Sequence, residues 1–144
     1  MNTMHPRTLR THTKLYNCVL MGEQAQDAGG PYRESWSMYA QELQSTALPL
    51  LIRTPNGVHA AGMGRDRYVP NPGATSAVQV EMFVFLGKIM GHAMSRSQEF
   101  IGLTLSSVVW KTLAGQEVHR EDLDSVDVLL TRSMQDIRKI HQKG

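Results

Sequence analysis

One cysteine is the side chain of this sequence most able to act as a nucleophile. Cys18 is the only cysteine among the 144 residues, so no internal disulfide can form and nothing indicates an oxidising compartment. A reactive cysteine needs a nearby histidine or a helix N-terminus that favours its thiolate. Cys18 instead lies between Asn17 and Val19 in an apolar segment, which is typical of a buried structural thiol.

Six histidines are the next candidates for acid–base or metal chemistry: His5, His12, His59, His92, His119 and His141. No two have the i, i+4 spacing of a zinc protease, and no cysteine accompanies them at the spacing of a zinc site. His92 follows a glycine in a segment typical of a buried helix, where it could be a ligand or a base. Because partners for either role are missing, we expect a core histidine and no metal site.

A compact charged group surrounds a double glycine near residue 30. Asp27, Arg33 and Glu34 flank Gly29-Gly30. A catalytic carboxylate is one interpretation. The alternative, which we favour, is that Asp27 caps the loop or the next helix while Arg33 ties the loop to the body. No second carboxylate has a convincing partner role, so we assign no catalytic residue.

Two glycine-rich segments, Gly29-Gly30 and Gly62-Met63-Gly64, could suggest a loop that cradles phosphate. Neither has the full dinucleotide fingerprint, and no Gly-Lys-Ser or Gly-Lys-Thr occurs as a P-loop requires. The sequence therefore predicts no nucleotide and no other cofactor.

Length and charge set the broad class. A chain of 144 residues is one ordinary domain or part of a larger one. Its net charge of +2 is spread along the sequence, except for a basic opening with Arg7, Arg10 and Lys14. That opening could be a nucleic-acid tail or a weak mitochondrial presequence, but we favour a flexible arm over residues 1–13. Neither a signal peptide nor a membrane span is indicated, so we expect the cytoplasm, or else the nucleus.

The elements that position these residues begin with a predicted strand over Leu15–Met21 and a loop over Gly22–Gly30. A helix is predicted over residues 31–45. Pro31 suits its first position, and Glu34 is expected in its first turn, where the helix dipole favours negative charge. Its apolar side is formed by Trp36, Tyr39, Ala40 and Leu43.

A β-hairpin with a long connection is predicted next. Leu48–Arg53 has the pattern of a short buried strand, and Arg67–Val69 can pair back on it. Between them, Asn56-Gly57 is typical of a turn with positive φ.

A long helix is predicted from the cap Ser76 to about Ser95. Its apolar face contains Met82, Phe85, Leu86, Ile89, Met90, Ala93 and Met94. Gly87 and Gly91 are four residues apart and stack on one face. Each costs the helix about 1 kcal/mol relative to alanine, so we expect another element to approach closely there.

Further helical segments follow: Thr104–Leu113, which stops at Gly115, a short turn over Glu121–Val126, and a last helix capped by Asp127. In the last helix Leu130, Met134, Ile137 and His141 recur on one side. The predicted fold class is α+β, mostly helical, with one or two small β-hairpins segregated from the helices.

Three short motifs occur in a fixed order: Gly22-Glu23 with Asp27 to Glu34, then Tyr68-Val69-Pro70-Asn71-Pro72, then Phe83 to Ala93. Each is weak alone, because glycine and proline punctuate many folds. Together they resemble the start of a HECT domain, the catalytic module of one class of ubiquitin ligases. Thr54-Pro55-Asn56-Gly57 and Arg65-Asp66-Arg67 look most similar to the giant HECT ligases that carry RCC1-type repeats.

The resemblance implies that residues 14–144 form the larger part of a HECT N-lobe. In that family the N-lobe docks a ubiquitin-conjugating enzyme, and a C-lobe cysteine accepts ubiquitin as a thioester before passing it to a substrate lysine. The docking subdomain and the C-lobe are absent from this sequence, and Cys18 does not match the family's reactive cysteine. The intact protein is expected to be a ubiquitin transferase, and this chain alone is expected to be inactive.

The resemblance carries over signature positions whose role looks structural: Asp27, Gly29, Gly30, Arg33, Glu34, Asn71, Pro72, Gly87 and Gly91. Two other functions stay open. One is a stand-alone, non-catalytic interaction module derived from a HECT N-lobe. The other is a small basic helical domain that binds nucleic acid, which the even scatter of charge disfavours. We expect no membrane partner.

Overall fold

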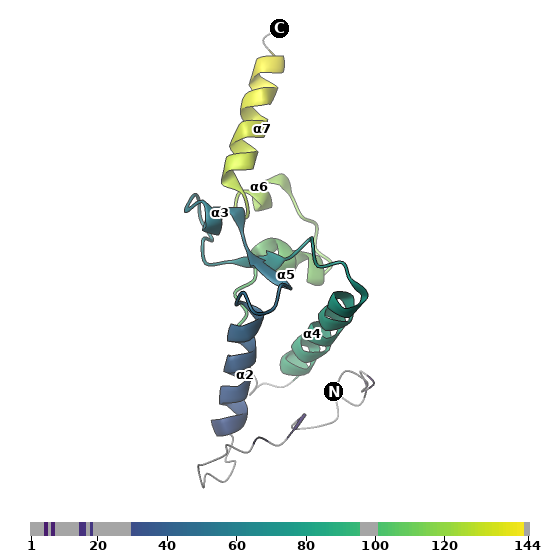
Figure 1. Ribbon diagram of the computed structural model, residues 1–144. Coiled ribbons are helices and arrows are strands. Elements are labelled where there is room, and N and C mark those ends of the chain that lie inside the picture. The colour runs from purple at the N-terminus through teal and green to yellow at the C-terminus, as the bar shows by residue number, and fades with distance from the viewer. Residues whose placement is uncertain are drawn as a thin grey trace. The chain divides into compact units, whose positions relative to one another are not determined.

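The computed structural model describes His5, Arg7, Leu15, Tyr16, Cys18 and the ranges 30–95 and 101–142 (Figure 1). The chain forms two compact units that interleave in sequence. Unit 1 comprises residues 1–50 and 72–103, and unit 2 comprises residues 51–71 and 104–144. Apart from His5 and Arg7, the predicted arm of residues 1–13 lies outside the described residues, as does most of the predicted opening strand. Leu15, Tyr16 and Cys18 are described and are not in a strand.

Unit 1 is built on two helices, α2 (Gly30–Leu43) and α4 (Ala77–Ser95). Tyr32 and Trp36 of α2 and Ile89 of α4 form its buried core. Further side chains pack against this core: Leu15, Tyr16, Phe85 and Ile101. Both helices were predicted, and each ends within two residues of the predicted position. The prediction that Glu34 lies in the first turn of this helix is wrong, because α2 begins at Gly30 and its first turn contains no acidic residue.

Aromatic rings stack through this core. The ring centroids of Trp36 and Tyr32 are 5.9 Å apart in an edge-to-face arrangement. The imidazole of His92 stacks on the Trp36 ring at 6.4 Å with an interplanar angle of 18°. His92 is buried, which confirms the prediction of a core histidine. Tyr16 reaches the same cluster, and its burial raises the pKa of its phenol.

The start of α4 follows the predicted cap. The Ser76 hydroxyl accepts from the backbone N–H of Gln79 at 3.3 Å, and the Gln79 side chain accepts from the Ser76 N–H at 3.1 Å. This reciprocal pair satisfies two backbone donors that a helix start leaves unpaired. Leu86 and Ile89 of the predicted apolar face are buried, together with His92. The prediction is wrong at both ends of that face, because Met82 and Met94 are exposed.

Unit 2 is organised around a two-stranded antiparallel sheet, β1 (Leu51–Arg53) and β2 (Tyr68–Pro70). Ile52 pairs with Val69, as the predicted hairpin requires. Residues 104–106 were predicted to begin a helix, but they are extended. Leu105 forms a parallel bridge with Tyr68, whose backbone N–H donates to Thr104 O at 2.9 Å. Helix α5 therefore starts later, at Ser107, and runs to Leu113.

The connection from β1 begins with a one-turn helix, α3 (Pro55–Val58), where a turn with positive φ was predicted. Thr54 caps it by accepting from the Gly57 N–H at 3.2 Å, and Pro55 occupies its first turn. The positive φ angles come later in this connection, at Ala60, Gly62 and Gly64. A good cap followed by proline outweighs the turn preference of Asn-Gly here.

Two further helices end unit 2: α6 (Arg120–Leu123) and α7 (Val128–His141). The Asp127 side chain caps α7 as predicted, accepting from the Leu130 N–H at 2.9 Å. Beyond its first turn α7 extends away from the sheet of unit 2 (Figure 1). The fold is mostly helical with one small antiparallel sheet among the described residues, so the predicted α+β class is confirmed. None of the described helices has the length and hydropathy to cross a membrane.

Candidate functional site

A buried polar site of unit 2 is centred on the side chain of Asn56, which is 1% exposed. Its Nδ2 donates to Met63 O at 3.0 Å and to Asp124 O at 2.8 Å. Its Oδ1 accepts from the Val128 N–H at 2.8 Å. The backbone N–H of Asn56 also donates to Val126 O at 3.0 Å. We call this set of five residues the Asn56 node.

The Asn56 node joins segments that are about seventy residues apart in sequence. Asn56 lies on α3, whereas Asp124, Val126 and Val128 form the passage from α6 into α7. One amide side chain therefore fixes where α7 leaves the sheet. Because every polar atom of that side chain has a partner, its burial costs little and its geometry is rigid.

Glycines allow the chain to close around the node. A Cβ on Gly62 would lie 2.9 Å from Val128 Cγ1 and 3.0 Å from Asn56 Nδ2, and the φ of Gly62 is +63°. A Cβ on Gly64 would lie 3.0 Å from Ser125 O. The Gly62-Met63-Gly64 segment is thus a close backbone approach inside the protein, which explains its composition without a phosphate ligand.

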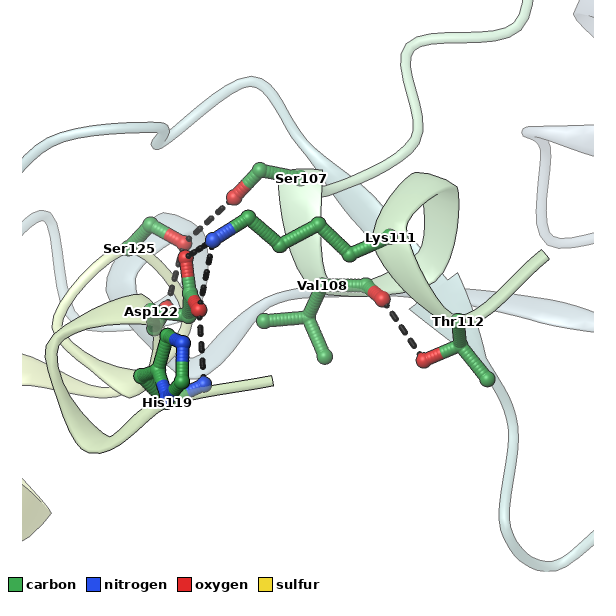
Figure 2. Close-up of polar contacts among 7 residues, drawn as sticks. All are labelled: Ser107, Val108, Lys111, Thr112, His119, Asp122 and Ser125. Carbon is green, nitrogen blue, oxygen red and sulfur yellow. Dashed lines mark hydrogen bonds and ion pairs between the residues drawn. The ribbon is translucent and has the colours of Figure 1, made fainter. Parts of the chain in front are cut away.

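A second polar cluster connects α5 with α6 (Figure 2). The Lys111 ammonium donates to both carboxylate oxygens of Asp122, at 2.7 Å and 2.8 Å. The backbone N–H of His119 donates to Asp122 Oδ2 at 2.9 Å. Lys111, and then the His119 N–H, hold the pKa of Asp122 below its ordinary value of 3.8. The hydroxyls of Ser107 and Ser125 approach each other at 3.2 Å beside this pair.

The lowered pKa of Asp122 makes the stability of unit 2 depend on pH. A carboxyl group whose pKa is lowered by folding stabilises the folded state above its unfolded pKa, and this contribution is lost as the pH falls through the folded value. We expect Asp122→Asn to flatten the decline of stability from about pH 4 downward. Urea unfolding at pH 5 and pH 3 measures this change.

Asp136→Asn is the matched control for that experiment. Asp136 pairs with Lys139 at 3.3 Å on α7, where both side chains are exposed. Exposed ion pairs of this kind contribute little to stability, so the stability of Asp136→Asn should depend on pH as that of the unchanged chain does. If Asp122→Asn and Asp136→Asn behaved alike, the cluster of Figure 2 would have no special role.

The signature positions are not gathered into one site. Asp27 and Gly29 lie outside the described residues, and Gly30 is the first residue of α2. Arg33 and Glu34 are exposed on α2, and neither side chain forms an ion pair with another described residue. The predicted tie between Arg33 and the preceding loop therefore stays a prediction.

The remaining signature positions lie in both units. Asn71 follows β2 directly and ends a segment of unit 2, whereas Pro72 begins a segment of unit 1. For Gly87 and Gly91 the expected close approach is not found, because no described residue lies within 4 Å of a Cβ placed on either glycine. Both glycines are exposed on α4. The close approach at these two glycines therefore stays a prediction.

Sequence reasoning missed the Asn56 node and the Lys111–Asp122 pair. Asn56 was interpreted as a turn residue, because its partners lie far along the sequence. A local signal did exist for Asp122, which lies three residues after His119 at the start of a short helix. An acidic side chain at this position can accept a hydrogen bond from the backbone N–H of the residue that caps the helix. Both sites position backbone segments, and neither presents a nucleophile with a base.

The described residues offer little else for catalysis. Cys18 is partly buried, and the chain's described part contains no cluster of three side chains suited to hold a metal ion. The hydrogen bonds described above fix backbone segments relative to one another within unit 2.

The family described as HECT-domain (ubiquitin-transferase) matches residues 37–144. E3 ubiquitin-protein ligase HERC2 of Mus musculus is 39% identical over 127 residues, which are 88% of this chain and 3% of that protein. Probable E3 ubiquitin-protein ligase HECTD4 of Homo sapiens is 30% identical over 118 residues, covering 81% of this chain and 3% of that protein. The chain thus spans about 3% of the length of the curated relatives it matches.

These similarities confirm the resemblance inferred from the three motifs. The family match begins inside α2 and continues through both units, including the Asn56 node and the Lys111–Asp122 pair. The HERC2 similarity extends over most of the chain. The chain therefore belongs to the HECT-domain family of ubiquitin ligases.

Proposed function

We propose that the intact protein is a HECT-type ubiquitin ligase and that this chain is the main body of its N-lobe. Membership of the family and the similarity to E3 ubiquitin-protein ligases support the transferase activity. The conjugating enzyme, ubiquitin and protein substrates would be its partners, in the cytoplasm or the nucleus. Nucleic acid and membranes are not among the partners we propose.

In this proposal the reacting thiolate belongs to a C-lobe. A cysteine there would attack the thioester of the conjugating enzyme, displace that enzyme's thiol and carry ubiquitin to a substrate lysine. The chain described here would hold the docking subdomain and the C-lobe in reach of one another, through rigid elements such as the Asn56 node. Cys18 takes no part, so this chain alone would transfer no ubiquitin.

The observation that carries the proposal is the uncovered apolar face of α7. Leu130, Ile137 and Ile140 are 52%, 66% and 73% exposed, although they recur on one side of the helix. Thr131 is the single buried residue of α7. Its hydroxyl is placed to donate a hydrogen bond to Asp124 Oδ1 and to Val128 O. A helix whose apolar side faces water is incomplete, because helical stability in proteins comes from packing that side. Further HECT-domain structure would supply the packing.

Labelling of an engineered thiol tests this proposal. In a Cys18→Ser background, Ile137→Cys should react with a maleimide at the rate of an exposed thiol in the 144-residue chain. In a polypeptide extended through a complete HECT domain, the same thiol should react at least about tenfold more slowly, because packing would bury it. Gln135→Cys, on the polar side of α7, is the control and should react equally in both. Equal rates for Ile137→Cys would contradict the proposal.

The second candidate is a non-catalytic interaction module that works without a C-lobe. The same exposed face of α7 favours it, since a stable module of this kind would use an apolar surface to bind a partner. The labelling experiment distinguishes the two, because a module that works alone predicts no protection from the added HECT-domain residues.

A further inference from the structure

Unit 1 contains an apolar cavity that the ubiquitin-transfer proposal does not use. Its volume is about 210 Å³, and residues of α2, of α4 and of the segments that follow them line it. Trp36, Tyr39 and Phe85 contribute aromatic rings, and Leu50 and Ile89 contribute aliphatic walls. An apolar cavity of roughly 150 Å³ holds a benzene molecule. This cavity is therefore large enough for one aromatic ring with a short chain.

The aromatic walls are held in place by the core of unit 1. Trp36 packs edge to face on Tyr32 and on Tyr39, with centroids 5.9 Å and 6.3 Å away. Ile89 is buried in the same cluster. Packing on several sides means that these walls do not collapse into the space, so the cavity is a preformed site.

One charged residue, Glu42, stands among the lining residues. Glu42 is exposed on α2, so it belongs to the mouth of the cavity, and no described residue forms an ion pair with it. Aromatic faces also attract cations, Trp most strongly. A carboxylate beside aromatic rings at the mouth of an apolar cavity fits a cation whose body is apolar.

We propose that this cavity binds a small arylalkylamine, with the ring among Trp36, Phe85 and Ile89 and the protonated amine beside Glu42. The site is independent of ubiquitin transfer and remains a proposal about unit 1 alone. A ligand with one ring and a two-carbon amine chain should bind with a dissociation constant on the order of 1 mM.

Phenethylamine and phenylacetate test the charge preference, because they share the ring and the chain length and differ in sign. Trp36 fluorescence in a Trp110→Phe background reports binding on the 144-residue chain. Phenethylamine should bind at least about fivefold more tightly than phenylacetate, and Glu42→Gln should remove about half or more of that preference. Glu34→Gln, on the same helix and outside the cavity, should leave both affinities unchanged.

An uncharged ligand and a substitution that fills the cavity test whether binding takes place inside it. Ethylbenzene should bind with an affinity between those of the two charged ligands, and Ile89→Trp should abolish binding of all three by occupying the space. Should Ile89→Trp fail to fold, the comparison of ligands on the unchanged chain and on Glu42→Gln decides the matter. Equal affinity for phenethylamine and phenylacetate, or absence of binding by either, would overturn the proposal.

Discussion

Replacing Asn56 with alanine is expected to lower the free energy of unfolding of unit 2 by about 3–5 kcal/mol. The substitution removes three side-chain hydrogen bonds. It also leaves the carbonyls of Met63 and Asp124 and the N–H of Val128 without that partner, and each buried orphan costs about 1–3 kcal/mol unless water reaches it. The free energy of unfolding of a small domain is only about 5–15 kcal/mol in total, so the variant should lose a large part of its stability.

Urea unfolding followed by circular dichroism measures this loss. Gln116→Ala is the control, because Gln116 is an exposed amide of the same unit. It should change the free energy of unfolding by no more than about 0.5 kcal/mol. A loss below about 1 kcal/mol for Asn56→Ala would show that the node does not determine how α7 joins the sheet.

Replacing Gly57 with alanine is expected to cost about 2–4 kcal/mol. A Cβ on Gly57 would collide with the backbone carbonyl oxygen of Arg65, which cannot move without disturbing the connection to β2. Alanine is favoured over glycine in a helix by about 1 kcal/mol, so the cost of the collision must be larger than this gain for the substitution to destabilise the protein.

Gly87→Ala is the matched comparison and should have the opposite sign. Gly87 also lies in a helix, but no described residue stands within 4 Å of its Cβ position. Alanine should therefore stabilise α4 by about 0.5–1 kcal/mol. Thermal unfolding of the two variants side by side measures both effects. A stabilising Gly57→Ala would mean that the turn around Arg65 adapts freely.

The elements that the sequence predicted well are those that local signals define. Ser76 and Asp127 are caps whose side chains act within three residues, and the structure places α4 and α7 directly after them. The two segments predicted to pair as a hairpin do pair, over Leu51–Arg53 and Tyr68–Pro70. Caps and periodicity depend on neighbouring residues only, so one sequence suffices to find them.

The features that the sequence did not predict depend on contacts between distant segments. Residues 104–106 form no helix, because Leu105 bridges to Tyr68, a partner thirty-seven residues earlier. Asn56 has partners near residues 124–128, so its preference for turns was the wrong guide. Met94 was predicted on the apolar face of α4 but is 84% exposed, because which side of a helix is covered depends on the elements that pack against it. Tertiary contacts outweighed local preference in each case.

The most direct test of the scaffold role uses a conjugating enzyme charged with ubiquitin. Incubated with this chain and resolved without reductant, the mixture should show no ubiquitin adduct on the chain, whereas a complete HECT domain of the family should form one that reductant removes. The wild-type chain and Cys18→Ser should give identical results. A reducible adduct that appears on the wild-type chain and disappears in Cys18→Ser would contradict the proposal that the reacting thiol lies outside this chain.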